Sequence, residues 1–352
     1  IDRFLTGFPG LVTYAVKANP SPDVLLTLAG AGLMTYDVAS VEEMATVRRV
    51  APHAQLHYHN PVKSRAEIAQ AYRDYGCRRF AADTAREIEK IVEGTAGDRG
   101  VEIAVRFRLA REAVSVHDFS SKFGASPEDA ARLLRLVGKL GPAPMLTFHP
   151  GSQCTDADAF RRHILAAAEI ARAARIRIGR LNVGGGFPAG YATSAAPDLS
   201  TFFAAIVDAM REAFGGLDRP RIECEPGRGL VATSTSLLTR VKLVRAERRE
   251  VFLNDGIYGG LMEAYQAPKL MPNARPIRSA GAFATQSAEF TVFGPTCDPL
   301  DRMPLALRLP VDIAEDDYVE FGPLGAYGAA TSTRFNGYGA GETVHVREAF
   351  AD

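Results

Sequence analysis

The sequence contains no tryptophan, only four cysteines and no excess of charge of either sign. Its 41 basic side chains equal its 41 acidic ones, so charge gives no reason to expect nucleic acid or an anionic membrane as a partner. The cysteines form no C-x-x-C pair, which argues against a zinc knuckle and a disulfide scaffold and favours a reducing compartment. No apolar run approaches the roughly 20 residues of a bilayer-spanning helix. We therefore expect a cytoplasmic protein that is not anchored in a membrane and that acts on a small molecule.

The chain has 352 residues, of which 47% are hydrophobic, enough for one large barrel or for two domains. From residue 11 to residue 225, short apolar runs alternate with amphipathic stretches, a rhythm typical of β/α units. The predicted strands are Leu11–Val16, Leu33–Asp37, Gln55–His59, Arg79–Ala82, Val101–Phe107, Met145–Phe148, Arg180–Val183 and Arg221–Glu223. The predicted helix starts are Ser21 before Pro22 and three capping boxes, Ser40 with Glu43, Ser64 with Glu67 and Thr84 with Glu87. Eight such units predict a closed (β/α)₈ barrel, with a doubly wound open sheet as the alternative.

After Gly229 the rhythm changes, because β-branched runs are separated by glycine, proline and asparagine turns instead of long helices. Examples of these runs are Leu237–Val244, Glu289–Phe293 and Tyr318–Phe321. We therefore predict an α/β protein with a barrel domain at 1–229 and a mostly β domain at 230–352. The chain enters its first predicted strand at residue 11, which leaves almost nothing to pair with the β domain, so we expect that an N-terminal segment is absent from this sequence.

Nearly every predicted barrel strand ends in, or is directly followed by, polar residues or glycines, at the edge where barrel enzymes place their active sites. These residues are Lys17, Asp37, His59, Asn60, Arg106, His149, Gly184, Gly185, Gly186 and Glu225. The glycine run together with Arg228 fits a phosphate, although a triple glycine is as often a plain turn. Lys17 fits an amine that forms an imine, because desolvation favours the neutral, nucleophilic form of a lysine amine. The alternative is a lysine whose side chain simply extends toward water. A phosphate site, an imine-forming lysine and a carboxylate after the last strand together suggest pyridoxal 5′-phosphate.

Six motifs in order resemble those of one family, the fold-type III, alanine-racemase-like decarboxylases of basic amino acids, and most of all its ornithine decarboxylase group. The motifs are Tyr14–Asn19, His149–Ser152, Gly184–Pro188, Glu225–Arg228, Asn254–Gly256 and Gly294–Asp298. The resemblance runs from Tyr14 to about Tyr338. Three positions depart from the usual pattern, Pro150, Gly229 and Pro299, and none of them removes a group that carries chemistry.

The resemblance implies a role for each matching residue. Lys17 holds the cofactor as an imine, Glu225 faces the pyridine nitrogen and His149 stacks on the ring. Asp37, Glu43 and Arg106 support these groups, Ser152, Gly186 and Arg228 are the phosphate ligands, and Tyr327 closes over the phosphate. The other residues expected to bind the cofactor are Gly184, Gly185 and Gly227. Cys297 returns a proton to Cα, while Asp255, Asp298 and Tyr327 contact the substrate. The resemblance also implies a homodimer whose active sites are shared between subunits.

The implied reaction is decarboxylation of L-ornithine to putrescine, a step of polyamine synthesis, with L-lysine or a dual preference as the runner-up. Arginine stays open, and a substrate with a second carboxylate is less suited because Asp298 would repel it. A non-catalytic regulator and a racemase are the other classes, the first disfavoured by the retained Lys17, Glu225, Cys297 and Asp298. His57 and His59 share a strand face, but no third ligand lies at metal spacing, so we expect no metal site. Cys77, Cys154 and Cys224 are expected to be small buried core residues.

Overall fold

The computed structural model describes residues 1–109, 121–215, 219–339 and 341–350. The chain divides into two compact units, one made of residues 1–188 and 197–230 and the other of residues 189–196 and 231–352. Each unit is described by itself below. Among the described residues, no helix combines the length and the apolar character that crossing a bilayer requires.

The first unit is built on a parallel sheet of nine strands in its described part. Its strands are β1 (Leu11–Val12), β2 (Tyr14–Ala15), β3 (Thr35–Val38), β4 (Gln55–Tyr58), β5 (Arg79–Ala82), β6 (Glu102–Arg106), β7 (Ala143–Thr147), β8 (Arg180–Asn182) and β9 (Arg221–Cys224). β1 pairs with β9 and β2 pairs with β3, and the two are consecutive pieces of one chain segment separated only by Thr13. The sheet therefore closes on itself, and the predicted (β/α)₈ barrel is confirmed.

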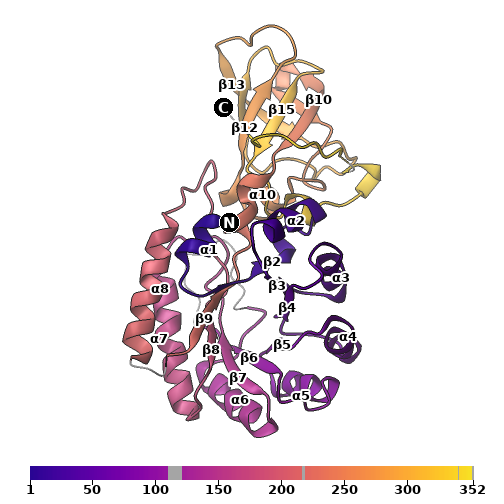
Figure 1. Ribbon diagram of the computed structural model, residues 1–352. Coiled ribbons are helices and arrows are strands. Elements are labelled where there is room, and N and C mark those ends of the chain that lie inside the picture. Colours follow the sequence, from indigo (N-terminus) through magenta and orange to yellow (C-terminus); the bar gives the residue numbers. More distant parts are fainter. Residues whose placement is uncertain (110–120, 216–218, 340, 351–352) are drawn as a thin grey trace. The chain divides into compact units, whose positions relative to one another are not determined.

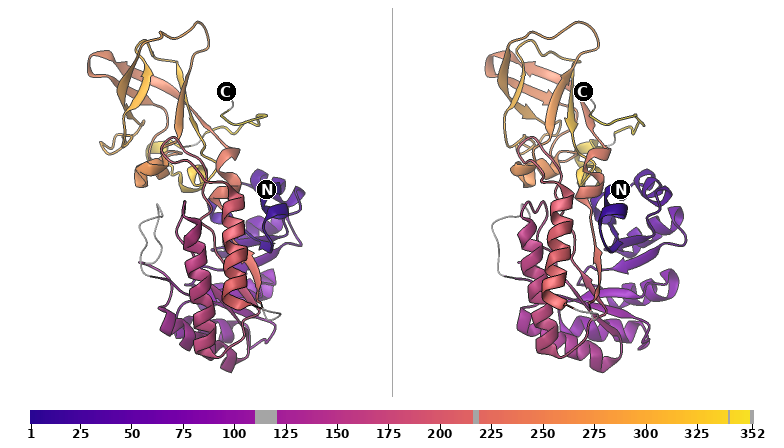
Figure 2. Two further views of the ribbon diagram at one scale, coloured as in Figure 1. Left: turned by 90° about the vertical axis from the view of Figure 1, so that its left-hand side faces the viewer. Right: turned by 60° about the vertical axis from the view of Figure 1, so that its left-hand side comes forward.

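Helices surround the strands of this unit (Figure 1), as right-handed β/α connections require. They are α1 (Asp2–Gly7), α2 (Pro22–Gly30), α3 (Val41–Val50), α4 (Arg65–Tyr75), α5 (Ala85–Gly94), α6 (Pro127–Leu140), α7 (Ala157–Ala174) and α8 (Leu199–Phe214), with the one-turn helix η1 (Val16–Ala18) after β2. The two long helices α7 and α8 run side by side (Figure 2) and are joined by a bidentate pair in which Arg161 donates to Glu212. The short helix α9 (Arg228–Val231) follows β9.

The predicted helix starts are correct, but only one capping box is complete. Ser64 and Glu67 exchange both hydrogen bonds. Ser40 and Thr84 each accept the expected backbone bond, whereas their glutamates bind elsewhere. The Glu43 carboxylate accepts a hydrogen bond from the N–H of Ala39 at 2.7 Å. The Glu87 carboxylate accepts a hydrogen bond from the backbone N–H of Lys63 and forms an ion pair with the Lys63 ammonium, both at 3.0 Å. Other partners therefore replace the local bond in both cases.

The second unit contains a mixed six-stranded sheet in the order β12-β15-β10-β11-β13-β14. Its strands are β10 (Leu237–Arg245), β11 (Glu250–Leu253), β12 (Asn273–Ile277), β13 (Ser287–Phe293), β14 (Leu307–Pro310) and β15 (Tyr318–Gly322). Its helical turns are η2 (Ala232–Ser234), η3 (Ala246–Arg248), α10 (Met262–Gln266), η4 (Pro268–Leu270), α11 (Gly328–Thr331) and η5 (Phe335–Gly337). All neighbouring strands are antiparallel except β11 and β13. Buried side chains of β10, β11, β13 and β15, including Val241, Val251, Val292 and Phe321, form its core.

One segment differs from the predicted division of the chain. Residues 189–196 were predicted in the barrel domain but group with the second unit. The physical reason is two hydrogen bonds to that unit, from the Ala192 N–H to the Met271 carbonyl at 3.3 Å and from the Thr193 hydroxyl to the Lys269 carbonyl at 2.8 Å. A hydrophobicity pattern does not record such bonds.

Candidate active site

Lys17 lies at the carboxyl ends of the barrel strands, in the one-turn helix η1 directly after β2. Its neighbours Val16 and Ala18 are buried, while Lys17 itself is exposed. The structure thus differs from the expectation of a desolvated amine, since Lys17 is exposed. Its charge acts on Asp37, Glu43, Glu225 and His149, so the structure brings together residues that are widely separated in the sequence.

Glu225 follows β9 and is held by two side chains from other strands. The Nδ1 atom of His59, just after β4, makes a very short contact with Glu225 Oε1, and Asn182 Nδ2, at the end of β8, donates to the same oxygen at 2.6 Å. Burial alone would raise the pKa of Glu225, but the charge and hydrogen bond of His59, the charge of Lys17 and the Asn182 bond together lower it to about 2. Glu225 is therefore an ionised carboxylate, and its side chain keeps 11% exposure.

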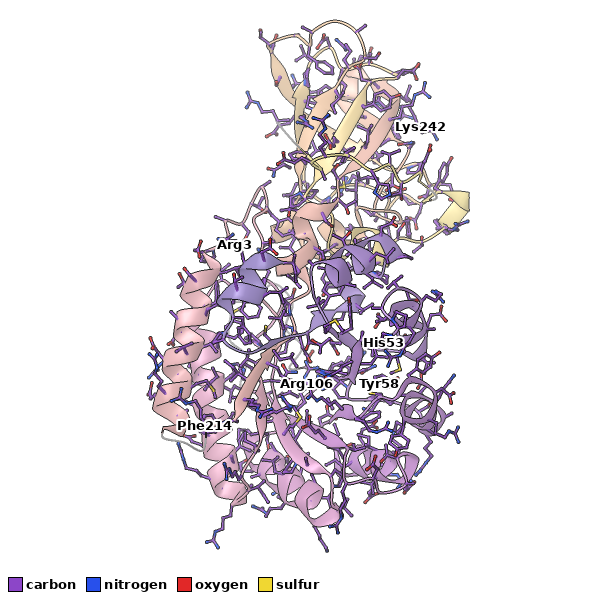
Figure 3. The ribbon with its side chains drawn as sticks, viewed as in Figure 1. Arg3, His53, Tyr58, Arg106, Phe214 and Lys242 are labelled. Atoms are coloured by element: carbon purple, nitrogen blue, oxygen red, sulfur yellow. The ribbon has the colours of Figure 1, made fainter. Side chains whose placement is uncertain are left out.

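Asp37, at the end of β3, has the opposite electrostatic behaviour. Burial and then the charge of Glu225 raise the pKa of Asp37 to about 7, against the opposing charges of Lys17 and His59. Burial also raises the pKa of Glu43. Arg106, at the end of β6, lies inside the ring of strands (Figure 3), where its guanidinium interacts electrostatically with Glu225 and Asp37. Two neighbouring carboxylates with pKa values moved apart are typical of a functional site.

His149 and the glycine run form the next part of the mouth. Burial and the charges of Lys17 and Arg106 lower the pKa of His149 well below its usual value, which favours the neutral ring. Its Nδ1 accepts the N–H of Gly151 at 3.0 Å. A Cβ on Gly185 would come within 2.6 Å of the Glu225 carbonyl oxygen and 3.3 Å of His149 Nε2. The glycine run therefore packs directly against both predicted cofactor residues.

The glycine run differs from the prediction at one donor. The N–H of Gly184 is not available to an anion, because it donates to Asn182 Oδ1 at 2.8 Å. Among the described residues, the N–H groups of Gly185 and Gly186 donate no hydrogen bond within the chain. These two donors remain for a phosphate.

Ser152 and Arg228 are both buried and adjacent. Arg228 Nε and Nη2 each lie 3.4 Å from Ser152 Oγ, and the two residues are 7% and 4% exposed, Ser152 first. Gly227 must be small at this point, because a Cβ would lie 2.9 Å from the Cβ of Ala18. Residues 76 positions apart in the sequence thus meet as one hydroxyl and one guanidinium, the donor types that bind phosphate.

The structure corrects the expectation that His57 and His59 have no third partner. Glu223 of β9 places a carboxylate oxygen within 4.8 Å of one ring nitrogen of each histidine, so the three residues could together bind a metal ion. Asp37, His59 and Glu225 form a second set of three possible metal ligands. The sequence could not show this, because β4 and β9 are far apart along the chain. Arg79 Nη1 donates to His57 Nε2 at 2.8 Å and to Glu223 at 3.3 Å, so a guanidinium already occupies the place beside both groups.

The remaining predicted residues lie in the second unit. Cys297 is exposed, whereas Cys77, Cys154 and Cys224 are buried, as predicted. The Cys297 thiol donates to Asn336 Oδ1 at 3.2 Å, and its own N–H donates to the same oxygen at 3.1 Å. The Tyr258 hydroxyl donates to Asp298 Oδ2 at 2.5 Å, and this bond lowers the pKa of Asp298 and raises that of Tyr258 to about 12.

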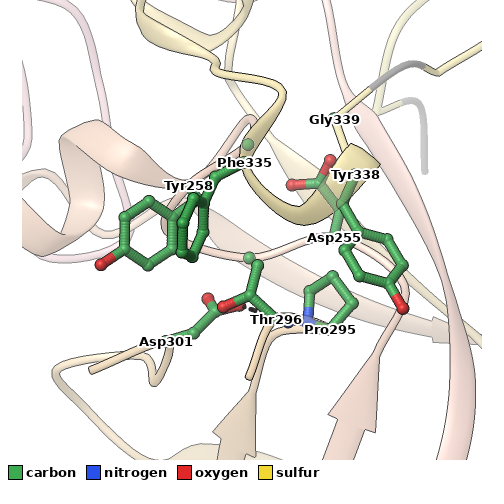
Figure 4. Close-up of a pocket in the computed structure, with 10 residues that line it drawn as sticks. Asp255, Tyr258, Pro295, Thr296, Asp301, Phe335, Tyr338 and Gly339 are labelled. Carbon is green, nitrogen blue, oxygen red and sulfur yellow. Dashed lines mark hydrogen bonds between the residues drawn. The ribbon is translucent and has the colours of Figure 1, made fainter. Parts of the chain in front are cut away.

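A pocket in the second unit lies between the Asp255 turn and the Thr296 loop (Figure 4). Asp255 Oδ1 accepts the N–H of Gly260 at 2.9 Å, and burial raises its pKa. Phe335 and Tyr338 also line the pocket. Tyr327, predicted at the phosphate, is half-buried in the same unit and has the left-handed backbone angle φ +60° before α11.

The sequence matches the family described as "Pyridoxal-dependent decarboxylase, pyridoxal binding domain" over residues 2–232. The chain belongs to this family of pyridoxal-dependent decarboxylases. It is 33% identical to a lysine/ornithine decarboxylase of Selenomonas ruminantium over 344 residues, covering 95% of this chain and 82% of the relative.

Two solved structures illustrate the shared fold. An arginine decarboxylase of Paramecium bursaria Chlorella virus superposes with a TM-score of 0.84 at 26% identity, over 96% of this chain and 90% of that one. A lysine/ornithine decarboxylase of Vibrio vulnificus, solved with putrescine, gives a TM-score of 0.82 at 27% identity, over 97% and 89%.

The barrel mouth of this decarboxylase fits pyridoxal phosphate in its donor set. The exposed amine suits the aldehyde of the cofactor, and the ionised, partly covered carboxylate suits its pyridine nitrogen. The neutral histidine ring suits the face of the pyridine ring, and the buried hydroxyl–guanidinium pair suits the phosphate. The sequence patterns did not reveal Asn182, Tyr258 and Asn336 and gave His59 no role. Asn182 and His59 lie at the ends of predicted strands, and this position indicates residues at the barrel mouth. Nothing in the sequence marks Tyr258 or Asn336 as functional residues.

Proposed function

We propose that this decarboxylase acts on L-ornithine and releases putrescine, with L-lysine as the second substrate. The observation that carries the proposal is the carboxylate of Asp298, which the bonds from Tyr258 and from the Leu300 N–H keep ionised beside Cys297. An ionised carboxylate suits the distal ammonium of a diamino acid and repels a second substrate carboxylate. The names of the relatives, which include ornithine and lysine, support the same class.

The residues of the barrel would each hold one part of the cofactor. Lys17 would bind it through its amine, Glu225 would face the pyridine nitrogen, His149 would cover the ring, and Ser152, Arg228 and the N–H groups of Gly185 and Gly186 would hold the phosphate. Pyridoxal phosphate, when bound, accepts the electron pair that is left at Cα when carbon dioxide departs. Because Glu225 is ionised, it would keep a proton on the pyridine nitrogen and so would strengthen that electron withdrawal.

Cys297 would then deliver the proton that replaces carbon dioxide at Cα. The hydrogen bond from its thiol to Asn336 Oδ1 would hold the sulfur atom in position. The position of Cys297, rather than its acidity alone, would select the face of Cα that is protonated.

The substrate assignment is tested by measuring carbon dioxide release from ornithine, lysine, arginine and diaminopimelate, side by side and with cofactor supplied. We expect ornithine to be preferred and diaminopimelate to be inactive. Asp298→Asn should raise KM for ornithine by roughly tenfold or more with a smaller change in kcat, because it removes a charge-assisted hydrogen bond to substrate. An unchanged KM, or a preference for diaminopimelate, would remove Asp298 from the substrate site. A racemised amino acid product would instead indicate the racemase class.

We also propose that the active enzyme is a homodimer with shared sites. Lys17 and Glu225 belong to the first unit and Cys297 and Asp298 to the second. Lys17→Ala and Cys297→Ala should each be nearly inactive, and mixing them under subunit exchange should restore roughly a quarter of wild-type activity, since half of the dimers become hybrids with one intact site. If exchange is demonstrated and no activity returns, each chain completes its own site.

A further inference from the structure

Glu225, the carboxylate expected to face the cofactor, is held from inside the barrel by His59, which lies just beyond β4. Glu225 Oε1 is bound by both His59 Nδ1 and Asn182 Nδ2, and both side chains are buried. Among the described residues, both hydrogen bonds of the Glu225 side chain use Oε1. The other oxygen is therefore left for the pyridine nitrogen that the proposed function assigns to it.

Three buried polar atoms of His59 and two of its neighbours have no hydrogen-bond partner among the described residues. They are His59 Nε2, His57 Nδ1 and Glu223 Oε1. The three residues are 6%, 1% and 1% exposed, and one donor atom from each lies within 4.8 Å of the others. Leaving three such groups unsatisfied in a protein interior would be costly, so they are expected to share a ligand.

The hydrogen-bond pattern decides what kind of ligand fits. A guanidinium can only donate, so the bond from Arg79 Nη1 makes His57 Nε2 an acceptor. Burial, His59 and Arg79 lower the pKa of His57 well below its usual value, so the ring is neutral and carries its hydrogen on Nδ1. A protonated nitrogen cannot bind a metal ion, and Arg79 adds positive charge beside Glu223. These two facts disfavour a cation.

A water molecule would satisfy all three atoms. It can accept from His57 Nδ1–H and from His59 Nε2–H and donate to Glu223 Oε1, which is within the two to four partners that buried waters have. A water about 2.8 Å from two atoms at the tetrahedral angle separates them by roughly 4.6 Å. This span is of the order of the 4.8 Å within which one ligand atom of each of the three residues lies.

We propose that His59 is a positioning residue for Glu225, held in place by an ordered water that it shares with His57 and Glu223. This inference rests on the proposed function, because it concerns the carboxylate that faces the cofactor. His59 binds Oε1 of Glu225 and leaves the other oxygen to the cofactor. It orients the carboxylate and keeps it ionised, while Asn182 fixes the same oxygen.

The charges around His59 agree with this role. Burial lowers the pKa of His59, but the carboxylates of Glu225, Asp37 and Glu223 outweigh it and raise the pKa above its usual value. Other charged or titratable groups around this cluster are His57, Arg79, Arg180, Lys17, Arg106, His149 and Cys224. A protonated His59 donates from both ring nitrogens, which serves Glu225 and the water at once.

The first test uses the cofactor-free protein. Ring-labelled histidine is titrated by NMR, with the His59 signal assigned from the spectrum of His59→Gln. We expect Glu225→Gln and Glu223→Gln each to lower the pKa of His59. A His59 pKa that neither substitution moves would overturn the proposal even if the proposed function is correct, and this arm needs no activity.

The second test uses the loaded enzyme, with exposed His53→Ala as the matched control. His59→Ala should weaken pyridoxal phosphate affinity roughly tenfold and lower kcat by tenfold or more, with KM changed less than twofold. His59→Gln, which keeps a donor, should recover part of both losses. Equal behaviour of the His59 and His53 variants would overturn the positioning role.

The two failures are distinguishable. A wild-type protein that binds no cofactor and releases no carbon dioxide contradicts the proposed function, and the NMR arm then decides the role of His59 alone. A high-resolution crystal structure should show one water bonded to His57, His59 and Glu223. Anomalous scattering from a metal ion at that point would overturn the water and the tautomer from which it was inferred.

Discussion

Gly184→Ala should damage both the stability and the cofactor site of the enzyme. Gly184 has the left-handed angle φ +68°, and a Cβ there would lie 2.2 Å from the carbonyl oxygen of Phe148. The left-handed conformation costs a residue with a Cβ about 1–2 kcal/mol, and forcing extra volume into a packed position costs about 1–3 kcal/mol more. The free energy of unfolding should therefore fall by about 2–5 kcal/mol.

The damage should reach the cofactor site through two hydrogen bonds. The Gly184 carbonyl accepts the N–H of Glu225 at 2.8 Å, and its N–H donates to Asn182 Oδ1 at 2.8 Å. A shift of the backbone at this residue moves the cofactor carboxylate and the amide that orients it. Loss of one such bond is worth about 1 kcal/mol, so pyridoxal phosphate affinity should weaken by roughly fivefold or more.

The matched control is Gly179→Ala, because Gly179 lies directly before the first residue of β8. A Cβ there meets nothing within 4 Å. Melting is followed by circular dichroism, since the chain has no tryptophan, and cofactor binding by absorbance. At about 2–4 °C per kcal/mol, Gly184→Ala should lower Tm by about 4–20 °C, while Gly179→Ala should change it little or raise it slightly. Equal Tm and equal cofactor affinity in the two variants would refute the reasoning.

Three further predictions concern single side chains. Borohydride reduction of the loaded enzyme should attach the cofactor to Lys17, because the ammonium of Lys63 is buried and bound to the Asn60 and Ala81 carbonyls at 2.8 and 2.6 Å; a label on Lys63 or Lys122 would contradict the assignment. Arg228→Ala should weaken cofactor affinity roughly tenfold or more, with Arg228→Lys intermediate because an ammonium lacks the two-pronged donor; the exposed Arg221→Ala at the start of β9 is the control. Burial and Glu225 raise the pKa of Asp37 to about 7 in the folded protein, against about 3.9 in an unfolded chain. Between these two pH values only the folded state holds the proton, so the contribution of Asp37 to the free energy of unfolding falls as the pH rises. Asp37→Asn should therefore flatten the pH dependence of the free energy of unfolding of the cofactor-free protein over that window, and identical pH profiles of the two proteins would count against the raised pKa.

The barrel and the residues of its mouth follow from the order of the amino acids alone. Alternating strands and capped helices are local patterns, and right-handed connections allow few arrangements of eight such units. Because parallel strands all end at one edge, the residues after them, such as Lys17, Asp37, His149 and Glu225, are placed together by the pattern of the chain. The period of two along a strand also puts His57 with His59 on one face, and Glu223 with Glu225 on another.

Which of these groups meet depends on the closure of the barrel. β4 and β9 are separated by four other strands in the sheet order, and it is the closure through β1 and β2 that turns both inward faces toward one interior. His59 then reaches Glu225, and Glu223 approaches both histidines, although nothing in the spacing of the residues requires it. The same holds for Glu87 of one predicted capping box, since it binds Lys63 from another segment. Local periodicity fixes which face a side chain occupies, whereas its partner depends on contacts between segments distant along the chain.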